Sequence, residues 1–599
     1  MLKYVPLICV VAGLLAALAS AAWVMSRKVS NGRISEAAGL VQDGVSVFFK
    51  RMIIPLLIVT VAFSAVITFV VNWKAAVLYA AGCVLAFLAV YYGMRITVKG
   101  NIRTAVSSAV SGPIAAFKIA YKSGAVVGLL ICVLSLLGLG AVLVLFKLKS
   151  VTQIVACFGL GASTVAIFAR IGGGIYNRAS AYAAEKVTGD YPDIGQESIN
   201  NPVYVSHKVG QEIGDVCGMS AEMLETYVGS LVAAVMLAAV AVNSSGVTST
   251  FTLGTAALFP LIIAGMGLIV SIVSMMFVRY SPKGEQTGPL VTASIIASVL
   301  ISGASFYFSN ELLQSYIYGV AISLGIICGL VVGPLSRINH ETLPTILVGA
   351  AVLGSYYCVG TYGIALAAIG MLSIVTMRVS YQAFGPITYN ANFIAEFSNL
   401  SEDVLEKTSL LNKIGRSTAP IGKSFSICAA AMTAISLLIS YAAVNEIDSI
   451  SLLDPVILVS MLIGAMLPFS YSALVGKAVE SVSNGIFKEA RAQLRERKEL
   501  VEGTAEPDYK ACSKVAADHS IRAITITSML AILVPVIIGM LLGVQALGAL
   551  IAGMVAAGAL NAMTNRDISG TSINTFVKTV IFVSLVFSAV FINYGGVLL

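Results

Sequence analysis

Charge is scarce in this chain. Only 11% of its 599 residues are Asp, Glu, Lys or Arg, and 58% are hydrophobic, whereas soluble proteins carry about 25% charged residues. This composition excludes a soluble globular protein, a disordered chain and a fibrous repeat. Apolar runs of about twenty residues recur from end to end, and each can cross the roughly 30 Å hydrocarbon core of a bilayer. The sequence therefore predicts a polytopic membrane protein.

Motifs for several kinds of chemistry are also missing. The three histidines, His207, His340 and His519, are far apart in the sequence, and no Cys/His spacing suggests a zinc site. The nine cysteines are mostly single and lie inside apolar runs, which favours buried thiols over disulfides. No Walker sequence and no Gly-x-Ser-x-Gly elbow with its own His and Asp is evident. Membrane orientation explains the basic loops, so no nucleic-acid partner is expected.

Sixteen apolar spans account for most of the chain. With no water in the hydrocarbon core, each span should be a helix that satisfies its own backbone hydrogen bonds. We therefore expect an all-α fold that forms a single membrane domain over residues 1–599. Its transmembrane helices should lie near residues 4–25, 52–72, 75–96, 123–147, 150–172, 214–243, 254–279, 289–308, 312–335, 342–360, 362–385, 420–443, 452–475, 521–543, 545–562 and 574–597.

The loop charges predict the orientation. The loops after even-numbered spans and the N-terminus hold few basic residues, namely Lys3, Lys74, Lys147 and Lys149, and all other Lys and Arg residues lie on the opposite side. Basic loops mark the cytoplasmic side, so both termini should be non-cytoplasmic. Residues 17–22 resemble a signal-peptidase site, but we favour a retained first helix because its removal would leave an odd number of spans.

The long predicted cytoplasmic segments should carry the chemistry, because the outward loops are short and neutral. Residues 476–520 are expected to form a charged cytoplasmic helical extension and loop, in which 477–503 continue the thirteenth span. A solvated charged helix is the default interpretation of that segment.

One segment is too specific to be generic membrane sequence. Residues 168–230 contain GGGIY at 172–176, GDVCGM at 214–219 and an acidic helix. These motifs resemble those of the membrane-bound, ion-translocating pyrophosphatases, which carry GGGIY, an acid-rich stretch and an Asp-rich turn ending in GDVAGM. Further blocks match over nearly the whole chain, namely GMRITVKGNIRTA (93–105), FGPITYNANFIAE (384–396), IGRSTAPIGKSF (414–425), MLPFSYSAL (466–474) and RDISGTSINTFVK (566–578).

The resemblance implies a homodimeric bundle of sixteen helices in the lipid bilayer. Members of the family hydrolyse magnesium-bound pyrophosphate at the cytoplasmic mouth of the bundle, and they pump protons, sodium ions or both outward. Such a site needs many acids, because Mg²⁺ prefers carboxylate oxygens. Further carboxylates orient and deprotonate the attacking water.

Most of those acids are replaced here. The family's acidic positions after GGGIY fall on Ala181 and Glu185, and the aspartates of its Asp-rich turn fall on His207, Gln211 and Asp215. Two asparagines of that turn fall on Lys208 and Glu212, and later aspartates fall on Gln382, Tyr389, Asn412 and Met563. Each lost ligand would cost about 10–100-fold in metal affinity or activity.

We therefore expect a pseudoenzyme with weak or no hydrolysis. Asp215 and Asp567 are the residual catalytic positions. Glu185, Asp215 and Asp567 are the first candidate metal ligands, and Glu212, Glu222 and Glu396 are further acids that could complete a site. Together they could hold one Mg²⁺ with the help of substrate phosphates, but not the family's full set of metal ions.

The resemblance also implies an ion gate of buried charges. Its positions match Arg170, Asp215, Glu222, Glu225, Asp567 and Lys578. Glu222 and Glu225 are three residues apart and so share one face of the sixth span. Charges within spans usually face the bundle interior in pairs. Both an ion pathway and a structural ion-pair cluster stay open as interpretations.

The predicted mouth is basic. It carries Arg178, His207, Lys208, Arg416, Lys423 and Arg566. Arginine and lysine bind phosphate groups without a metal, so a mouth that binds pyrophosphate or another phosphorylated anion is one hypothesis, and drift of a disused site is the other. The alternatives for the whole protein are an active pyrophosphate-energised sodium or proton pump with a rebuilt metal shell and a structural membrane assembly protein.

Overall fold

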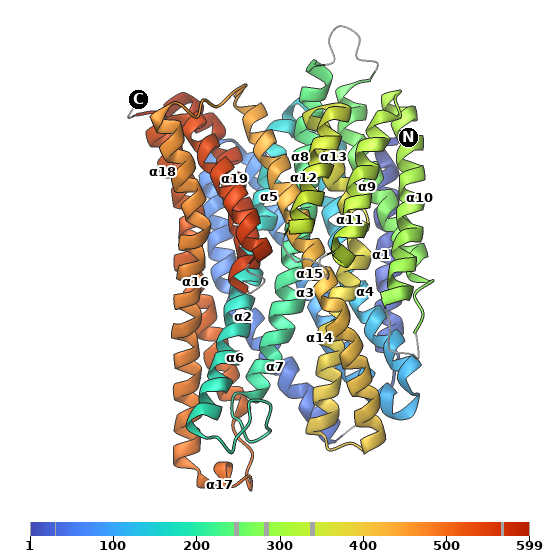
Figure 1. Cartoon of the computed structure of the whole chain (residues 1–599), viewed down its shortest axis with the longest axis vertical. Coiled ribbons are helices and arrows are strands. Elements are labelled where there is room, and N and C mark those ends of the chain that lie inside the picture. Colours follow the sequence, from blue (N-terminus) through green and yellow to red (C-terminus); the bar gives the residue numbers. More distant parts are fainter. Residues whose placement is uncertain are drawn as a thin grey trace.

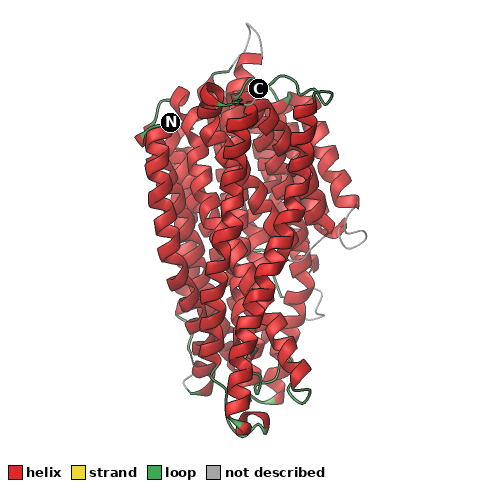
Figure 2. Ribbon diagram, turned by 90° about the vertical axis from the view of Figure 1, so that its left-hand side faces the viewer, coloured by secondary structure: helices red, strands yellow, loops and turns green. Residues whose placement is uncertain are grey.

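The computed structural model describes residues 2–29, 32–244, 251–280, 287–335, 342–564 and 568–597. Within these ranges the chain is helical and contains no strand (Figure 2). Both chain ends lie at the same end of the bundle (Figure 1), as an even number of spans requires. The side of the membrane on which they lie stays a prediction.

The helices follow one another with short connections. They are η1 (Leu2–Tyr4), α1 (Val5–Met25), α2 (Arg33–Val70), α3 (Trp73–Val110), α4 (Pro113–Leu145), α5 (Leu148–Ala166), η2 (Ile167–Gly172), α6 (Gly173–Asp190), α7 (Tyr204–Glu212), η3 (Ile213–Gly218), α8 (Met219–Ser244), α9 (Leu253–Met275), α10 (Thr287–Leu313), α11 (Ile317–Leu335), α12 (Thr342–Val359), α13 (Thr361–Leu372), α14 (Val375–Phe397), α15 (Glu402–Val444), α16 (Pro455–Glu496), α17 (Lys498–Val501), α18 (Tyr509–Thr564) and α19 (Ile568–Tyr594).

These helices make the chain an integral multi-pass membrane protein. Fourteen of the described helical segments are long and apolar enough to cross a bilayer, and α13 with α14 forms a bent pair (45°) that counts as a fifteenth. α18 contains two helices, because Gly543 has non-helical backbone angles (φ 76°, ψ −177°). Dividing α18 there gives the sixteenth of the predicted spans.

α18 turns back on itself at Gly543. Before the turn, His519 contacts α16 at Gly485. After the turn, a Cβ at Gly464 of α16 would lie 2.0 Å from the carbonyl oxygen of Leu550, and Gly558 lies beside Pro468. After the turn, residue numbers therefore increase in the same direction along both helices, so the second half of α18 runs parallel to α16. A positive φ such as that of Gly543 is a conformation that glycine adopts without strain.

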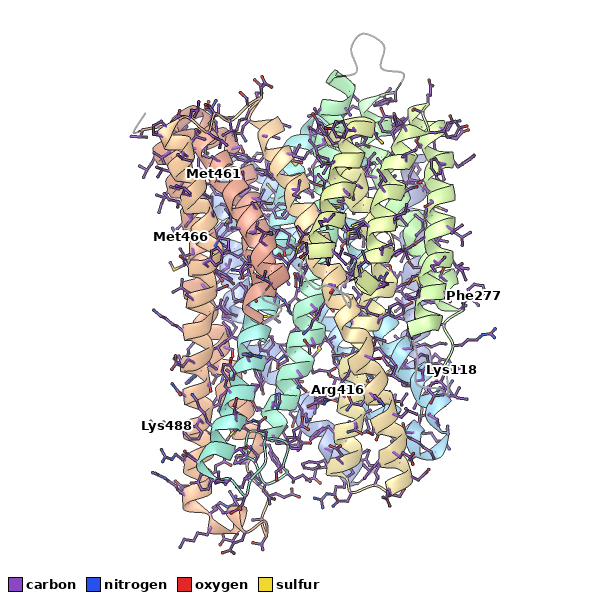
Figure 3. All side chains as sticks on the ribbon, in the orientation of Figure 1. Lys118, Phe277, Arg416, Met461, Met466 and Lys488 are labelled. Atoms are coloured by element: carbon purple, nitrogen blue, oxygen red, sulfur yellow. The ribbon has the colours of Figure 1, made fainter. Side chains whose placement is uncertain are left out.

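The bundle has an inner and an outer layer of helices. In the segment Ile154–Asp190, an apolar stretch of 18 residues is 100% buried. In α2, only 11% of the corresponding stretch is buried. Exposed apolar side chains such as Met466 and Phe277 point outward from the bundle (Figure 3), as expected for contact with lipid tails. Arg170, Glu222 and Glu225 are buried and thus belong to the centre of the molecule, whereas Glu185 is exposed.

Several helices extend beyond their predicted spans at the end opposite to the termini. α2 begins at Arg33, well before the predicted span at 52–72, and α16 continues as one helix to Glu496. α17 lies at this far end (Figure 1). Helix α7 and the loop before it also lie in this half of the molecule (Figure 1), which is the predicted mouth.

Candidate functional site

Two π-helical segments lie at the centre of the site. η2 and η3 interrupt the otherwise α-helical segments that carry GGGIY and GDVCGM. They approach closely because Gly218 has no side chain: a Cβ there would lie 3.2 Å from the carbonyl oxygen of Ala169. Single-turn π segments are frequent at functional sites. The two motifs therefore bring their polar side chains to one place.

The first buried ion pair joins η2 to α8. Arg170 Nε lies 3.0 Å from Glu222 Oε2, and the two side chains are only 3% and 2% exposed. Asn574 Nδ2 donates a hydrogen bond of 3.3 Å to Glu222 Oε1, and an Arg170 terminal nitrogen donates one of 3.3 Å to the carbonyl of Gly214. Arg170 of η2 and Asn574 of α19 thus converge on Glu222 of α8.

The second buried ion pair joins α19 to α8. Lys578 Nζ lies 2.8 Å from Glu225 Oε2, and neither side chain is exposed. The ammonium also donates to Thr226 Oγ1 at 2.7 Å. Ser163 Oγ donates to Glu225 Oε1 at 2.5 Å and lies 2.6 Å from Thr579 Oγ1. The carboxylate and the ammonium are therefore held by hydroxyl groups as well as by each other.

These two pairs form what we call the ion-pair layer. Its two positive and two negative charges balance. Pairing and hydrogen bonding are the conditions under which charges can be kept inside a membrane protein. The structure brings together the four predicted residues of the layer, which are Arg170, Glu222, Glu225 and Lys578.

A second polar group, the mouth cluster, surrounds Lys208 of α7. It consists of Glu197, His207, Lys208, Tyr389 and Arg416. The Lys208 side chain is only 3% exposed, and its Nζ lies 3.3 Å from Glu197 Oε1 and donates to the hydroxyl of Tyr389. Tyr389 in turn donates to Glu197 Oε1 at 3.0 Å.

The aromatic ring of Tyr389 gathers two cations. Lys208 Nζ lies 3.9 Å and the guanidinium carbon of Arg416 lies 5.4 Å from its centroid, within the range of cation–π attraction. Figure 3 shows Arg416 in the half of the molecule opposite to the termini. His207 instead pairs with Gln211 across 3.2 Å.

Glu197 supplies the negative charge of the mouth cluster. Burial raises the pKa of its carboxyl, but the Lys208 ammonium and the Tyr389 hydroxyl outweigh burial, so the net pKa lies below the ordinary value. Glu197 is thus held ionised beside Lys208. The positive charge of Lys208 is already balanced within the protein.

A third buried acid, Glu212, lies between Lys208 and Glu222 in the sequence. Glu212 is fully buried, and its Oε2 accepts hydrogen bonds from Asn101 Nδ2 at 3.2 Å and from Asn390 Nδ2. Asp215 is half-buried and makes no hydrogen bond or ion pair with the described residues. Asp215 is therefore the acid of this motif that keeps a free carboxylate in the described structure.

Known proteins resemble this chain along nearly its whole length. The model of the inorganic H⁺ pyrophosphatase family matches residues 11–342 and 323–570. A putative K⁺-stimulated pyrophosphate-energized sodium pump of Clostridium tetani is 33% identical over 658 aligned positions that cover 96% of each chain. The chain belongs to the membrane-bound pyrophosphatase family.

Two further relatives are named for different transported ions. A K⁺-insensitive pyrophosphate-energized proton pump of Methanosarcina mazei is 30% identical, with 90% of this chain and 85% of the relative covered. A K⁺-stimulated pyrophosphate-energized sodium pump of Thermotoga maritima is 26% identical, with 92% and 88% covered. The 658 aligned positions of the clostridial relative exceed the 599 residues of this chain, so that relative carries segments that this pyrophosphatase homologue lacks.

The structure describes two of the three predicted metal ligands, Glu185 and Asp215. Glu185 is exposed on α6, and Asp567 lies outside the described residues together with Arg566. Among the side chains that the structure describes, no three of the types His, Cys, Asp and Glu lie close enough to hold a metal ion. The described donors therefore do not fit a magnesium pyrophosphate site of the kind that the resemblance implies.

Two other predicted cations of the mouth, Arg178 and Lys423, lie among the described residues. Arg178 of α6 lies with its guanidinium carbon 4.9 Å from the ring of Tyr182. Lys423 of α15 is half-buried, and it makes no ion pair with a described residue. Of the predicted anion-binding residues, the structure groups His207, Lys208 and Arg416.

Sequence reasoning missed several partners. Glu197, Asn101, Asn390, Asn574 and Ser163 hold the charged groups, yet none of them was a predicted site residue. Asn101 and Asn390 lie inside two of the blocks that match the family, which is the signal that could have found them. Glu197 lies in a loop between matched motifs and carries no such signal.

Proposed function

We propose that this chain is a divergent membrane pyrophosphatase homologue with weak or no hydrolysis of magnesium pyrophosphate. In this proposal it keeps the buried ion-pair layer and has a metal-free mouth. The observation that carries the proposal is the Lys208 ammonium, buried at a position of the family's Asp-rich turn and bonded to Glu197 and Tyr389.

An ammonium at this position opposes metal binding. Two unit charges of like sign 4 Å apart repel by about 4 kcal/mol at the effective dielectric of a protein site. Mg²⁺ also demands octahedral oxygen ligands. The nearby Glu212 is engaged by internal donors, which leaves Asp215 as the free acid of this motif in the described structure. The positive charge that a metal would bring is here supplied by the protein itself.

The ion-pair layer supports an ion-related role more than a hydrolytic one. Four buried charges that span η2, α8 and α19 are costly to keep in a membrane, and such residues mark ion pathways by default. The same pairs also suit a purely structural bundle. The proposed function is therefore a conduit or sensor that responds to an anion at the mouth. The alternative hypothesis is a structural membrane protein without such a response.

One finding favours an active pump as a second candidate. Relatives that share 26–33% of their aligned residues with this chain are named as pyrophosphate-energized pumps. Activity would require metal ligands beyond the described residues, with Asp567 the first of them, to complete a shell around Asp215.

Phosphate release separates these candidates. The purified chain is given pyrophosphate and millimolar Mg²⁺, with and without Na⁺ and K⁺, beside the Thermotoga maritima relative as the positive control. The proposal expects release no greater than that of an Asp215→Ala, Asp567→Ala double variant. Release that the double variant abolishes would overturn the proposal and establish the pump.

Ion flux separates the conduit from the structural protein. The folded chain is reconstituted in liposomes, and sodium and proton fluxes are followed before and after pyrophosphate is added. A flux that the double variant Lys578→Met, Glu225→Leu changes supports the conduit. No flux under any of these conditions favours the structural protein.

A further inference from the structure

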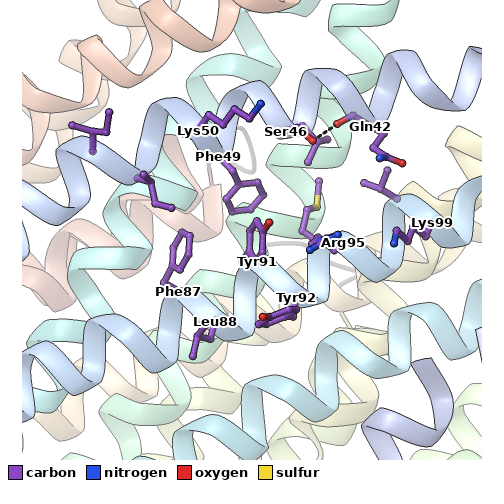
Figure 4. A pocket seen from close by; sticks show the side chains of 15 residues that line it. Gln42, Ser46, Phe49, Lys50, Phe87, Leu88, Tyr91, Tyr92, Arg95 and Lys99 are labelled. Atoms are coloured by element: carbon purple, nitrogen blue, oxygen red, sulfur yellow. Dashed lines mark hydrogen bonds between the residues drawn. The ribbon is translucent and has the colours of Figure 1, made fainter. Parts of the chain in front are cut away.

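A cavity of about 510 Å³ lies between α2 and α3, on the outer layer of the bundle. Figure 4 shows it between the two helices, with aromatic rings on one side and the basic side chains Lys50, Arg95 and Lys99 at its edge. None of these residues belongs to the mouth cluster or the ion-pair layer. The cavity is therefore separate from the predicted site.

The floor of the cavity is aromatic and rigid. The ring of Phe49 lies 5.3 Å from that of Tyr91 and 6.2 Å from that of Phe87, and Phe87 stacks on Tyr91 at 5.6 Å. Such edge-to-face and stacked pairs fix one another. This floor offers apolar surface to a ligand and no charge.

The rim of the cavity carries three cations without a described counter-charge. Lys50, Arg95 and Lys99 form no ion pair with a carboxylate among the described residues. The acids of the adjoining α2–α18 surface are already used, because Asp43 pairs with Lys510 and Asp518 with Arg51. The rim thus presents a net positive charge of three.

The cavity opens onto the lipid-facing surface of α2. Ile53 and Ile54 line it and are 46% and 63% exposed, and Leu57 and Ile58 continue the same exposed apolar face. The cations lie at the ends of the predicted spans 52–72 and 75–96, where helices leave the hydrocarbon. Basic side chains at this depth reach the headgroup layer.

We propose that this cavity binds an anionic glycerophospholipid. The phosphate and any further acidic group of the headgroup bind Lys50, Arg95 and Lys99, the glycerol backbone lies against Tyr91, and an acyl chain follows Ile54, Leu57 and Ile58. The excess of basic residues in cytoplasmic loops would by itself explain cations at this depth. It would not explain why a cavity with an aromatic floor lies between them. A soluble phosphate would leave that floor unused.

The test measures lipid retention on the intact chain. Wild type and a Lys50→Gln, Arg95→Gln, Lys99→Gln variant are placed in nanodiscs that contain a small fraction of phosphatidylglycerol in phosphatidylcholine, and bound lipid is counted by native mass spectrometry. One cation near a membrane surface contributes about 1 kcal/mol, so the triple variant should retain the anionic lipid roughly 100-fold less tightly. A Lys488→Gln, Arg495→Gln, Lys498→Gln variant removes the same charge from the distant end of α16 and from α17, and it should retain lipid as wild type does.

A second variant tests the cavity rather than its charge. Ser46 lines the cavity on an exposed face of α2, so Ser46→Trp should fill the space while keeping all three cations. We expect Ser46→Trp to lose the bound lipid at an unchanged thermal midpoint. Retention equal to wild type in Ser46→Trp, or equal loss in the triple variant and the α16 control, would overturn the proposal.

The lipid class is tested by competition. Phosphatidylcholine alone and free glycerol phosphate should each fail to displace bound phosphatidylglycerol. Displacement by glycerol phosphate would show a soluble-anion site and overturn the lipid assignment.

Discussion

The mouth cluster and the ion-pair layer both draw residues from the segment 168–230, but they differ in how completely their charges are buried. In the layer, Arg170, Glu222, Glu225 and Lys578 keep a balanced set of charges that are almost fully buried. In the mouth, Lys208 and Tyr389 stand at positions where the resemblance implies polar or acidic metal-binding groups, and they bind each other. The charges of the layer are thus held within the bundle whether or not the mouth binds a metal ion.

The largest expected effect comes from breaking the ion-pair layer. Lys578→Met leaves Glu225 buried without its cation and should lower the free energy of unfolding by about 3–5 kcal/mol. Unfolding in mixed micelles with rising SDS measures the loss. The double variant Lys578→Met, Glu225→Leu removes both charges and should recover most of it. An unchanged single variant would contradict the account of this layer.

A smaller effect is expected in the mouth cluster. Lys208→Met removes a buried donor from Glu197 and Tyr389 and should cost about 1–3 kcal/mol, because Glu197 is half-exposed and water can replace its partner. The matched control is Lys510→Met, whose ion pair with Asp43 lies at the surface and should change nothing measurable. A loss for Lys208→Met as large as that for Lys578→Met would erase the contrast between the two regions.

Magnesium should distinguish the mouth from a functional metal site. A metal bound at a hundredfold excess over its dissociation constant would stabilise the fold by about 2.7 kcal/mol. We expect the thermal midpoint to be unchanged by millimolar Mg²⁺ and by a chelator. A rise in midpoint with Mg²⁺ that Asp215→Ala removes would show that a metal shell has been rebuilt.

The smallest expected effect concerns pH. The pKa of Glu197 is lowered in the folded state, below an unfolded value near 4.3, so its stabilising contribution is present above that value and is lost as pH falls through the folded pKa. The unfolding midpoint of Glu197→Gln should therefore depend slightly less on pH between about pH 5 and 3. Glu502→Gln, which changes an exposed acid without a described ion pair, should keep the pH dependence of wild type.

The sequence was sufficient for the span pattern because the hydrocarbon core restricts the chain to helices of known length. The break between the predicted spans 521–543 and 545–562 agrees with the positive φ of Gly543. Helix ends were less predictable. α2 begins at Arg33, but its first turns lie outside the hydrocarbon and carry no continuous apolar run, so the search for apolar spans did not find this start. Such extensions depend on packing against the rest of the bundle.

The charged members of the site were predictable because charges inside spans are rare. Their neutral partners were not, since Ser, Thr and Asn are frequent in the spans and only the fold shows that Asn574 meets Glu222 across 352 positions of sequence. Glu185 illustrates a further limit: its motif position predicts a ligand, and only the fold shows that its side chain is exposed on α6. Motif spacing predicts which helix carries a residue, whereas the packing of that helix determines where the side chain points.

The most direct test of a metal-free mouth is a pyrophosphate titration of the purified chain by calorimetry, with Mg²⁺ and with a chelator. The account predicts that any binding is equal under the two conditions and that Lys208→Met changes it. Binding that occurs only with Mg²⁺ and disappears in Asp215→Ala would contradict the account.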